Sequence, residues 1–170
     1  ERWWGPGRTQ SLVLSTHAHP VPGVFLRRLD DRAPESPWFA WLGPVHFETF
    51  MGQLEEERDY SNAWFLGARF VFKPLDALEI GLYRTAQWGG EGRPQSFSSF
   101  VDLILGKDNF SAEDPDKVTE PGNQFAGLDA RFSLHPLGTP GALYAQMAGE
   151  DEANLFPSKR FWLFGVEKPV

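Results

Sequence analysis

The chain has 170 residues, which corresponds to one domain of ordinary size. It carries 16 Lys and Arg against 23 Asp and Glu, and this net charge of -7 excludes a nucleic-acid partner, because phosphates call for a basic surface. The chain has no cysteine, so disulfides, thiolate metal sites and a cysteine nucleophile are excluded as well. No apolar run reaches the roughly 20 residues of a transmembrane helix.

Aromatic residues make up 15% of the chain, with 7 Trp and 15 Phe, which is more than the core of a domain this small requires. A membrane β-barrel gives such residues a place, because its strands alternate lipid-facing apolar residues with polar residues that face the lumen. The same alternation keeps the mean hydropathy low, and here it is -0.37. The composition is therefore compatible with a β-barrel.

Segments of alternating apolar and polar residues, separated by Gly, Pro and acidic loops, predict about nine β-strands in chain order. The predicted strands are Ser11–Thr16, Val24–Asp30, Pro37–Leu42, Val45–Leu54, Ser61–Lys73, Ala77–Trp88, Gly122–Leu134, Ala142–Glu150 and Arg160–Glu167. The clearest alternation lies in Ser61–Lys73, where Trp64, Phe70 and Phe72 share one face while Arg69 and Lys73 share the other. Phe100–Leu105 fits a short helix or a strand equally well.

The connections between these strands fall into two classes that alternate along the chain. The short connections are His17–Gly23, Gly43–Pro44, Pro74–Asp76 and His135–Gly141, and the long polar ones are Asp31–Ser36, Glu55–Tyr60, Trp88–Asn123 and Gly149–Lys159. In an antiparallel meander, alternate connections lie at the same end, so short turns are predicted at one rim and long loops at the other. Outer-membrane barrels have this asymmetry. The same reasoning places Trp3–Gly7 at the long-loop rim.

The segment Gln87–Phe100 is predicted to be a shaped loop, because three glycines and a proline disfavour both helix and continuous strand. Its aromatic, carboxylate, guanidinium and amide side chains suit a sugar polymer, which offers hydroxyl groups and flat apolar ring faces. They suit a purely structural loop equally.

Catalytic and metal sites have weaker support. Glu91 and Glu150 can be the two carboxylates of a glycosidase only if they face each other about 5 to 10 Å apart. Calcium sites at Asp114 and Asp116, or at Glu150–Glu152, lack a fixed ligand spacing, and the pair His17 and His19 lacks a third ligand. We therefore expect no enzyme activity, no metal and no cofactor.

Four motifs resemble the Wzi family of outer-membrane capsule assembly proteins. They are WWGPG followed by SLVLS, QWGGEGRPQSFSSF, EPGNQFAGLDARFSL and YAQMAGEDE, and they occur in the family's order over nearly all 170 residues. The resemblance implies an all-β antiparallel up-and-down meander, part of an outer-membrane β-barrel of about eighteen strands. It also implies a lectin-like protein that holds capsular polysaccharide or exopolysaccharide at the bacterial surface without catalysis.

Relative to the family, the chain is short. The N-terminal helical bundle and further strands of the family are absent, so residues 1–170 are expected to form a single portion, about half, of the barrel. Unpaired strand edges are costly in lipid, which predicts that this sequence is a fragment or that its product needs a partner.

Seven residues are candidate polysaccharide contacts. They are Trp4, Arg69, Trp88, Glu91, Arg93, Gln95 and Glu150. Tryptophans would stack on sugar rings, arginines would pair with uronate or pyruvate carboxylates, and the others would hydrogen-bond to hydroxyls. Structural roles stay open: the two tryptophans as girdle or packing residues, Arg93 as a brace paired with Glu91, and Arg69 as a lining residue of a plugged lumen.

The expected partners are an acidic capsular polysaccharide or exopolysaccharide and outer-membrane lipid, with long loops facing the cell exterior and a monomer favoured for the full-length parent. Two other functions remain open. One is a polysaccharide-conducting pore, whose polar lumen would carry Arg69, Lys73, Glu79, Asp129 and Arg131. The other is a soluble carbohydrate-binding or hydrolytic β-sandwich, which would bury Trp64, Phe70 and Phe72 within the chain.

Overall fold

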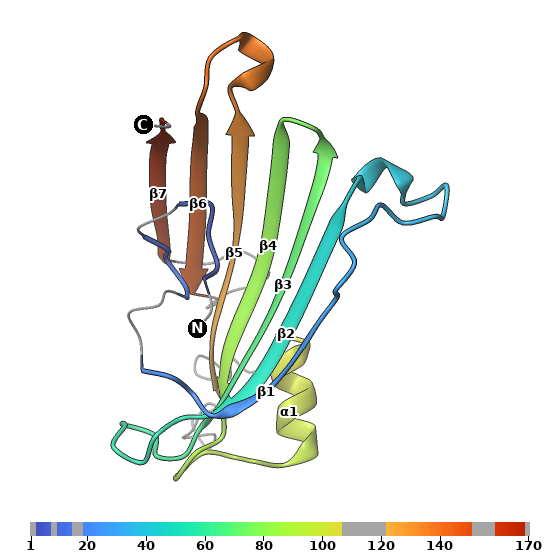
Figure 1. The fold of residues 1–170 in the computed structure, drawn as a ribbon. Helices are drawn as coiled ribbons and strands as arrows, with labels where there is room; N and C mark the ends of the chain where they lie inside the picture. Colours follow the sequence, from blue (N-terminus) through green and yellow to red (C-terminus); the bar gives the residue numbers. More distant parts are fainter. Residues whose placement is uncertain (1–2, 8–9, 15–18, 107–121, 151–158, 169–170) are drawn as a thin grey trace.

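The computed structural model describes residues 3–7, 10–14, 19–106, 122–150 and 159–168, with the side chain of Glu150 left out. These residues form one antiparallel sheet whose seven strands are neighbours in chain order (Figure 1). The strands are β1 (Gly23–Arg27), β2 (Val45–Gln53), β3 (Trp64–Leu75), β4 (Leu78–Trp88), β5 (Gly122–Ser133), β6 (Ala142–Glu150) and β7 (Lys159–Glu167). The predicted all-β antiparallel meander is confirmed.

The three helices are short: η1 (Ala40–Leu42), α1 (Phe97–Ile104) and η2 (His135–Leu137). Judged by length and hydropathy, none of the helices in the described ranges can cross a membrane. The helix alternative for Phe100–Leu105 is the correct one, although α1 begins three residues earlier, where the Ser96 side chain accepts a hydrogen bond from the backbone N–H of Ser99.

The predicted strand Pro37–Leu42 is wrong. Its backbone forms local turns, with Phe39 N–H donating to Ser36 O and Leu42 N–H donating to Phe39 O, both at 3.0 Å. The segment is apolar enough to resemble a buried strand, but Trp38 and Trp41 are three residues apart, and β1 and β3 already occupy both edges of β2. The predicted strand Ser11–Thr16 is also not found as a strand: its described part makes a single bridge, between Leu14 and Trp4.

The false strand also reversed part of the predicted loop arrangement. Residues 28–44 form one connection, at the same end of the sheet as residues 76–77 and 134–141 (Figure 1). We call this end the short-turn rim. The opposite end, with connections 54–63 and 89–106 and with the end of β6 and the start of β7, is the long-loop rim. Asp31–Ser36 therefore lies at the short-turn rim, and the described part of His17–Gly23 leads into β1 from the long-loop rim, each opposite to the prediction.

Strand register confirms the predicted division into two faces. On one face, which we call the inner face, Arg69 lies opposite Glu48 and Tyr83, and Gly81 lies opposite Asp129. The other, outer face carries the apolar members of the strands. Its large apolar residues include Val24, Leu26, Phe47, Met51, Trp64, Leu66, Phe70, Phe72, Leu78, Ile80, Leu82, Trp88, Leu128, Phe132, Leu143, Met147, Trp162, Phe164 and Val166.

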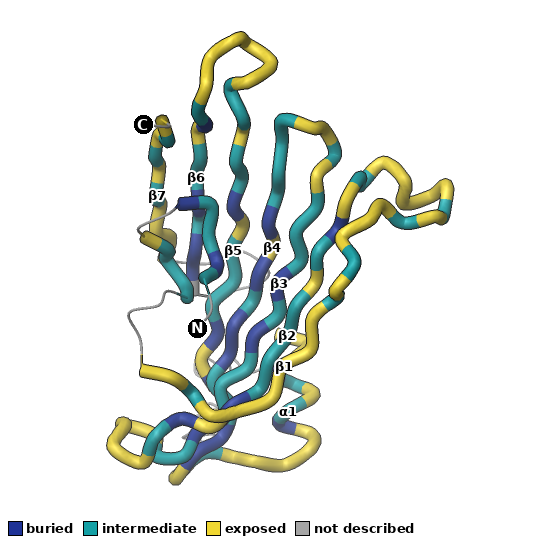
Figure 2. The backbone as a smooth tube through the Cα atoms, in the orientation of Figure 1, coloured by how far each residue is buried: buried dark blue, intermediate teal, exposed yellow. Residues whose placement is uncertain are grey.

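Burial differs across the sheet. Buried residues concentrate in β3 to β6, while β1 is exposed at every position and β7 is mostly exposed (Figure 2). The core cluster joins Trp4, Tyr83 and Ala148 on the inner face. Outer-face residues such as Leu82 and Phe164 are 46% and 69% exposed. The described residues contain no second sheet over this face, as a β-sandwich would require.

Candidate functional site

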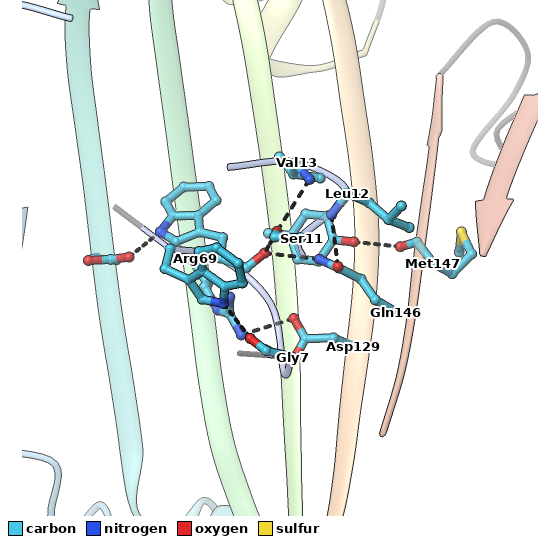
Figure 3. Close-up of polar contacts among 12 residues, drawn as sticks. Gly7, Ser11, Leu12, Val13, Arg69, Asp129, Gln146 and Met147 are labelled. Atoms are coloured by element: carbon cyan, nitrogen blue, oxygen red, sulfur yellow. Dashed lines mark hydrogen bonds and ion pairs between the residues drawn. The ribbon is translucent and has the colours of Figure 1, made fainter. Parts of the chain in front are cut away.

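An ion pair lies in the middle of the inner face. Arg69 Nη2 donates to both carboxylate oxygens of Asp129, at 3.0 and 2.9 Å, and both residues are buried (Figure 3). The pair bridges β3 and β5 across β4, which is possible because Gly81 has no side chain; a Cβ there would lie 2.7 Å from the Asp129 oxygens. Arg69, a candidate polysaccharide contact, is thus held by a protein carboxylate.

The other inner-face charges considered for a conducting lumen are paired too. Lys73 Nζ lies 3.2 Å from a carboxylate oxygen of Glu79, and Arg131 Nη2 lies 2.9 Å from one of Glu167. Together with Arg69 and Asp129, all five charged residues predicted to line a pore are in ion pairs. Such pairs lower the capacity of this face to guide a charged polymer.

The N-terminal segment lies against the inner face rather than at the long-loop rim, so its predicted position is wrong (Figure 1). Trp4 is fully buried, its ring centroid lies 5.5 Å from that of Phe50, and its Nε1 donates to Glu48. Its backbone oxygen accepts a hydrogen bond of 2.9 Å from Gln146 Nε2. In this structure the buried Trp4 ring offers no free face to a sugar.

Gln146 holds this segment through both polar atoms of its side-chain amide. While Nε2 donates to Trp4 O, Oε1 accepts from the backbone N–H of Leu12 at 3.0 Å (Figure 3). Tyr83 adds a hydrogen bond of 2.7 Å from its hydroxyl to Met147 O. The described part of residues 3–14 therefore occupies space over the inner face of β3 to β6.

At the long-loop rim, Arg93 stacks on an aromatic ring. Its guanidinium carbon lies 3.4 Å from the centroid of the Tyr60 ring, which is a cation–π contact. Arg93 Nε and Nη1 are buried yet have no hydrogen-bond partner. Buried N–H donors without partners are rare and costly, so these two groups are unsatisfied polar atoms of this loop, and an acceptor would satisfy them only after a local shift that admits it.

The loop around Arg93 has the shape predicted for its glycines. Gly89, Gly90 and Gly92 have φ values of +66°, +99° and +81°, which side chains disfavour. The Glu91 N–H donates to Ser61 O at 3.0 Å, which ties the loop to the connection that carries Tyr60. Among the described residues, no hydrogen bond or ion pair joins Arg93 to Glu91, so the predicted brace between them is not found.

The remaining candidates have different surroundings. Trp88 packs against α1: its Nε1 donates to Ser99 Oγ at 3.2 Å and its ring makes an edge contact with Phe100 at 5.1 Å. The side chains of Glu91 and Gln95 are exposed beside Arg93 in the same loop. Nothing is described for the Glu150 side chain, and hence for its distance from Glu91.

Glu91, Arg93 and Gln95 lie in one loop because they are neighbours in the chain, whereas Trp4 and Arg69 lie on the inner face of the sheet. The structure adds Tyr60, which the sequence reasoning missed because it treated Glu55–Tyr60 only as an acidic loop. The one aromatic at the end of a run of charges was the available signal. In this loop, a hydrogen bond from Arg58 lowers the pKa of Glu55 below its usual value.

Metal sites find no support in the described ranges, where no cluster of three or more His, Asp or Glu can hold an ion. Of the sites considered from sequence, Asp114, Asp116, Asp151, Glu152 and His17 lie outside the described residues.

Comparisons with known proteins place the chain within one family. The family model for the capsule assembly protein Wzi matches residues 1–170. A Klebsiella pneumoniae protein, named as an uncharacterized 55.8 kDa protein in the cps region, is 43% identical over 167 residues, which cover 98% of this chain and 32% of that protein.

A solved structure is similar over the same extent. It is described as Wzi, an outer membrane protein involved in group 1 capsule assembly in Escherichia coli and a carbohydrate-binding β-barrel. The TM-score is 0.81 at 38% identity, covering 98% of this chain and 34% of that one. The chain thus spans about a third of the length of each relative.

Proposed function

This chain belongs to the Wzi family of capsule assembly proteins, and from that premise we propose that it is part of an outer-membrane β-barrel that binds an acidic capsular polysaccharide or exopolysaccharide without chemically altering it. The similar solved structure is that of a carbohydrate-binding outer-membrane β-barrel. The open strands β1 and β7, which do not pair with each other, fit a barrel that further strands complete. The long-loop rim then faces the cell exterior.

The observation that carries the binding proposal is the Arg93 guanidinium on the Tyr60 ring. The ring holds the guanidinium plane in place, and two of its N–H groups are buried without a partner, so they would gain a hydrogen bond from an acceptor that enters as the loop shifts. A uronate or pyruvate carboxylate supplies planar, charged acceptor oxygens that match a guanidinium. The exposed side chains of Glu91 and Gln95 would hydrogen-bond to neighbouring hydroxyls.

The other candidates have supporting roles in this proposal. Trp88 holds α1 at the rim, and Arg69 with Trp4 stabilises the inner face beneath it. Glu150 stays a proposed hydroxyl contact at the same rim. Anchoring rather than conduction is favoured because residues 3–14 cover part of the inner face and its predicted pore charges are paired.

The test is binding of purified acidic capsular polysaccharide to the full-length, detergent-folded protein that contains these residues. Arg93→Ala is compared with wild type and with Arg58→Ala, which removes the same charge from the same rim but whose Nε already donates to Glu55 at 2.8 Å. Loss of a charged hydrogen bond costs about 1.5–3 kcal/mol, so Arg93→Ala should weaken binding roughly 10- to 100-fold. Arg58→Ala should bind as wild type.

A carboxyl-reduced form of the same polysaccharide should bind wild type more weakly than the unreduced form does. Arg93→Ala should bind the reduced and unreduced forms with equal affinity. If wild type binds the polysaccharide and Arg93→Ala binds as well, the site is elsewhere. If wild type binds no polysaccharide but conducts ions across a planar bilayer, the lectin proposal is wrong and a pore takes its place.

A further inference from the structure

Helix α1 lies on the outer face of the sheet, not over the lumen. Arg84 and Gln124, which belong to the outer face by register, hold its C-terminal end. Arg84 donates to the backbone oxygens of Ile104 and Leu103 at 2.7 and 2.8 Å, and Gln124 Nε2 donates to Leu103 O at 2.9 Å. These bonds satisfy carbonyls that the end of a helix leaves without partners, so the docking is specific.

The side of α1 away from the sheet is apolar. Phe97, Ile104 and Leu105 are 81%, 51% and 60% exposed, and Val101 is 36% exposed. A helix on the surface of a water-soluble protein normally has a polar face toward solvent. Here these exposed side chains of the helix are apolar, which is typical of a helix surface that contacts an apolar environment.

Strand register places the residues that hold α1 within the apolar band. Leu82, Phe70 and Leu128 form one row across the outer face. The next row toward the long-loop rim mixes Arg84 with the smaller Ala68, and the row after it is apolar again at Leu66. The band therefore continues to the pair Trp64 and Trp88, and in a barrel such aromatic residues mark the boundary between acyl chains and headgroups.

A groove runs between α1 and strands β1 and β2 at this level. Its volume is about 380 Å³, within the range of roughly 300–1,000 Å³ typical of small-molecule sites. Its floor is made of small outer-face residues, Thr49, Ala68 and Ala86, and most of the other lining residues are apolar, although Arg84 and Gln124 line it too. The apolar lining residues include Val24, Leu26, Met51, Leu66, Phe100 and Ile104.

We propose that this groove binds an acyl chain of lipopolysaccharide from the leaflet on the long-loop side. The proposal rests on the proposed membrane location. It is supported by the apolar lining, by the continuity of the floor with the lipid-facing row of Phe70 and Leu82, and by the apolar row of Met51 and Leu66 beyond it. The lipid headgroup would lie at the level of Trp64 and Trp88, near the rim where polysaccharide binds.

The first arm of the test measures where α1 lies. The chain has no cysteine, so a nitroxide can be attached at one introduced position in a cysteine-free, full-length background reconstituted in phosphatidylcholine vesicles. Ile104→Cys is compared with Leu128→Cys on the apolar band and Glu57→Cys in a rim loop. The Ile104 label should be more accessible to oxygen than to a water-soluble nickel complex, as the Leu128 label should be.

The outcomes of this arm separate the two proposals. A water-accessible Ile104 label with a lipid-accessible Leu128 label rejects the groove as a lipid site and leaves the membrane location intact. A water-accessible Leu128 label rejects the proposed barrel itself.

The second arm measures the bound lipid. Delipidated full-length protein is titrated with lipopolysaccharide and examined by native mass spectrometry, with phosphatidylcholine as the comparison lipid. Ala68→Phe fills the groove, and Ala68→Leu is a smaller change should the first variant not fold. Ala130→Phe makes the same change on the outer face away from the groove.

Wild type and Ala130→Phe should retain lipopolysaccharide that both Ala68 variants lose. If Ala68→Leu retains as much lipopolysaccharide as wild type, the proposal is wrong. It is also wrong if wild type retains no lipopolysaccharide because other parts of the full-length protein fill the groove. Stronger retention of phosphatidylcholine than of lipopolysaccharide overturns the assignment to that leaflet.

Discussion

The inner and outer faces of the sheet take alternate residues of the same strands, but their side chains find partners in different places. On the inner face, Arg69 and Asp129 satisfy each other's hydrogen-bonding groups, and the Gln146 amide bonds to the N-terminal segment. On the outer face Leu82, Leu128 and Phe164 remain 43–69% exposed. The inner face is completed within the chain, whereas the outer face depends on an apolar surrounding that the chain does not supply.

This contrast predicts the largest effect for the buried ion pair. Asp129→Ala leaves the buried Arg69 guanidinium without its carboxylate, which should lower the free energy of unfolding by about 3–5 kcal/mol. The measurement is urea unfolding of the full-length protein in lipid vesicles. A loss below about 1 kcal/mol, the value of exposed pairs, would show that burial does not govern this pair.

The outer face should respond to charge rather than to loss of a partner. Leu82→Arg places a cation on the apolar band and should cost about 2–4 kcal/mol of unfolding free energy in vesicles, as lipid-facing Arg does near the midplane of barrels. The control is Gln53→Arg, in the last outer-face row before the long-loop rim, and it should cost less because arginine near the interface is tolerated better. Equal costs would argue against the proposed depth of the Leu82 row.

Gln146 tests the attachment of the N-terminal segment. Gln146→Leu leaves Trp4 O and the Leu12 N–H without their partners, so the unfolding free energy should fall by about 1–3 kcal/mol. Limited proteolysis should then cleave residues 3–14 faster. The same change at the exposed Gln53 should leave both readouts near wild type. Unchanged cleavage in Gln146→Leu would show that apolar packing around Trp4 alone holds the segment.

The smallest effect is expected at the partly exposed inner-face pair. Lys73→Ala breaks a contact of 3.2 Å to Glu79 whose side chains are 48% and 32% exposed, and it should cost at most about 1 kcal/mol. Comparison of unfolding at low and high salt should show a smaller salt dependence in the variant, because salt screens exposed charges. A cost equal to that of Asp129→Ala would remove the distinction between buried and exposed pairs.

Sequence periodicity was sufficient for the parts of the fold that depend on neighbouring residues. Alternation in Ser61–Lys73 assigned Phe70 and Arg69 to opposite faces, and register confirms it. It failed at Pro37–Leu42, because a short apolar segment does not reveal that β2 already has both partners. That single error placed Asp31–Ser36 at the wrong rim.

The candidate site shows the same division. The sequence by itself determined the alternation, the seven longer strands and a glycine-shaped loop around Arg93. Tertiary structure alone decided that Arg69 meets Asp129, that Trp4 is buried against Phe50, and that Arg93 lies on Tyr60. These contacts join residues that are 33 to 60 positions apart in the sequence. A local pattern carries no information on which distant side chains meet when strands pair in register.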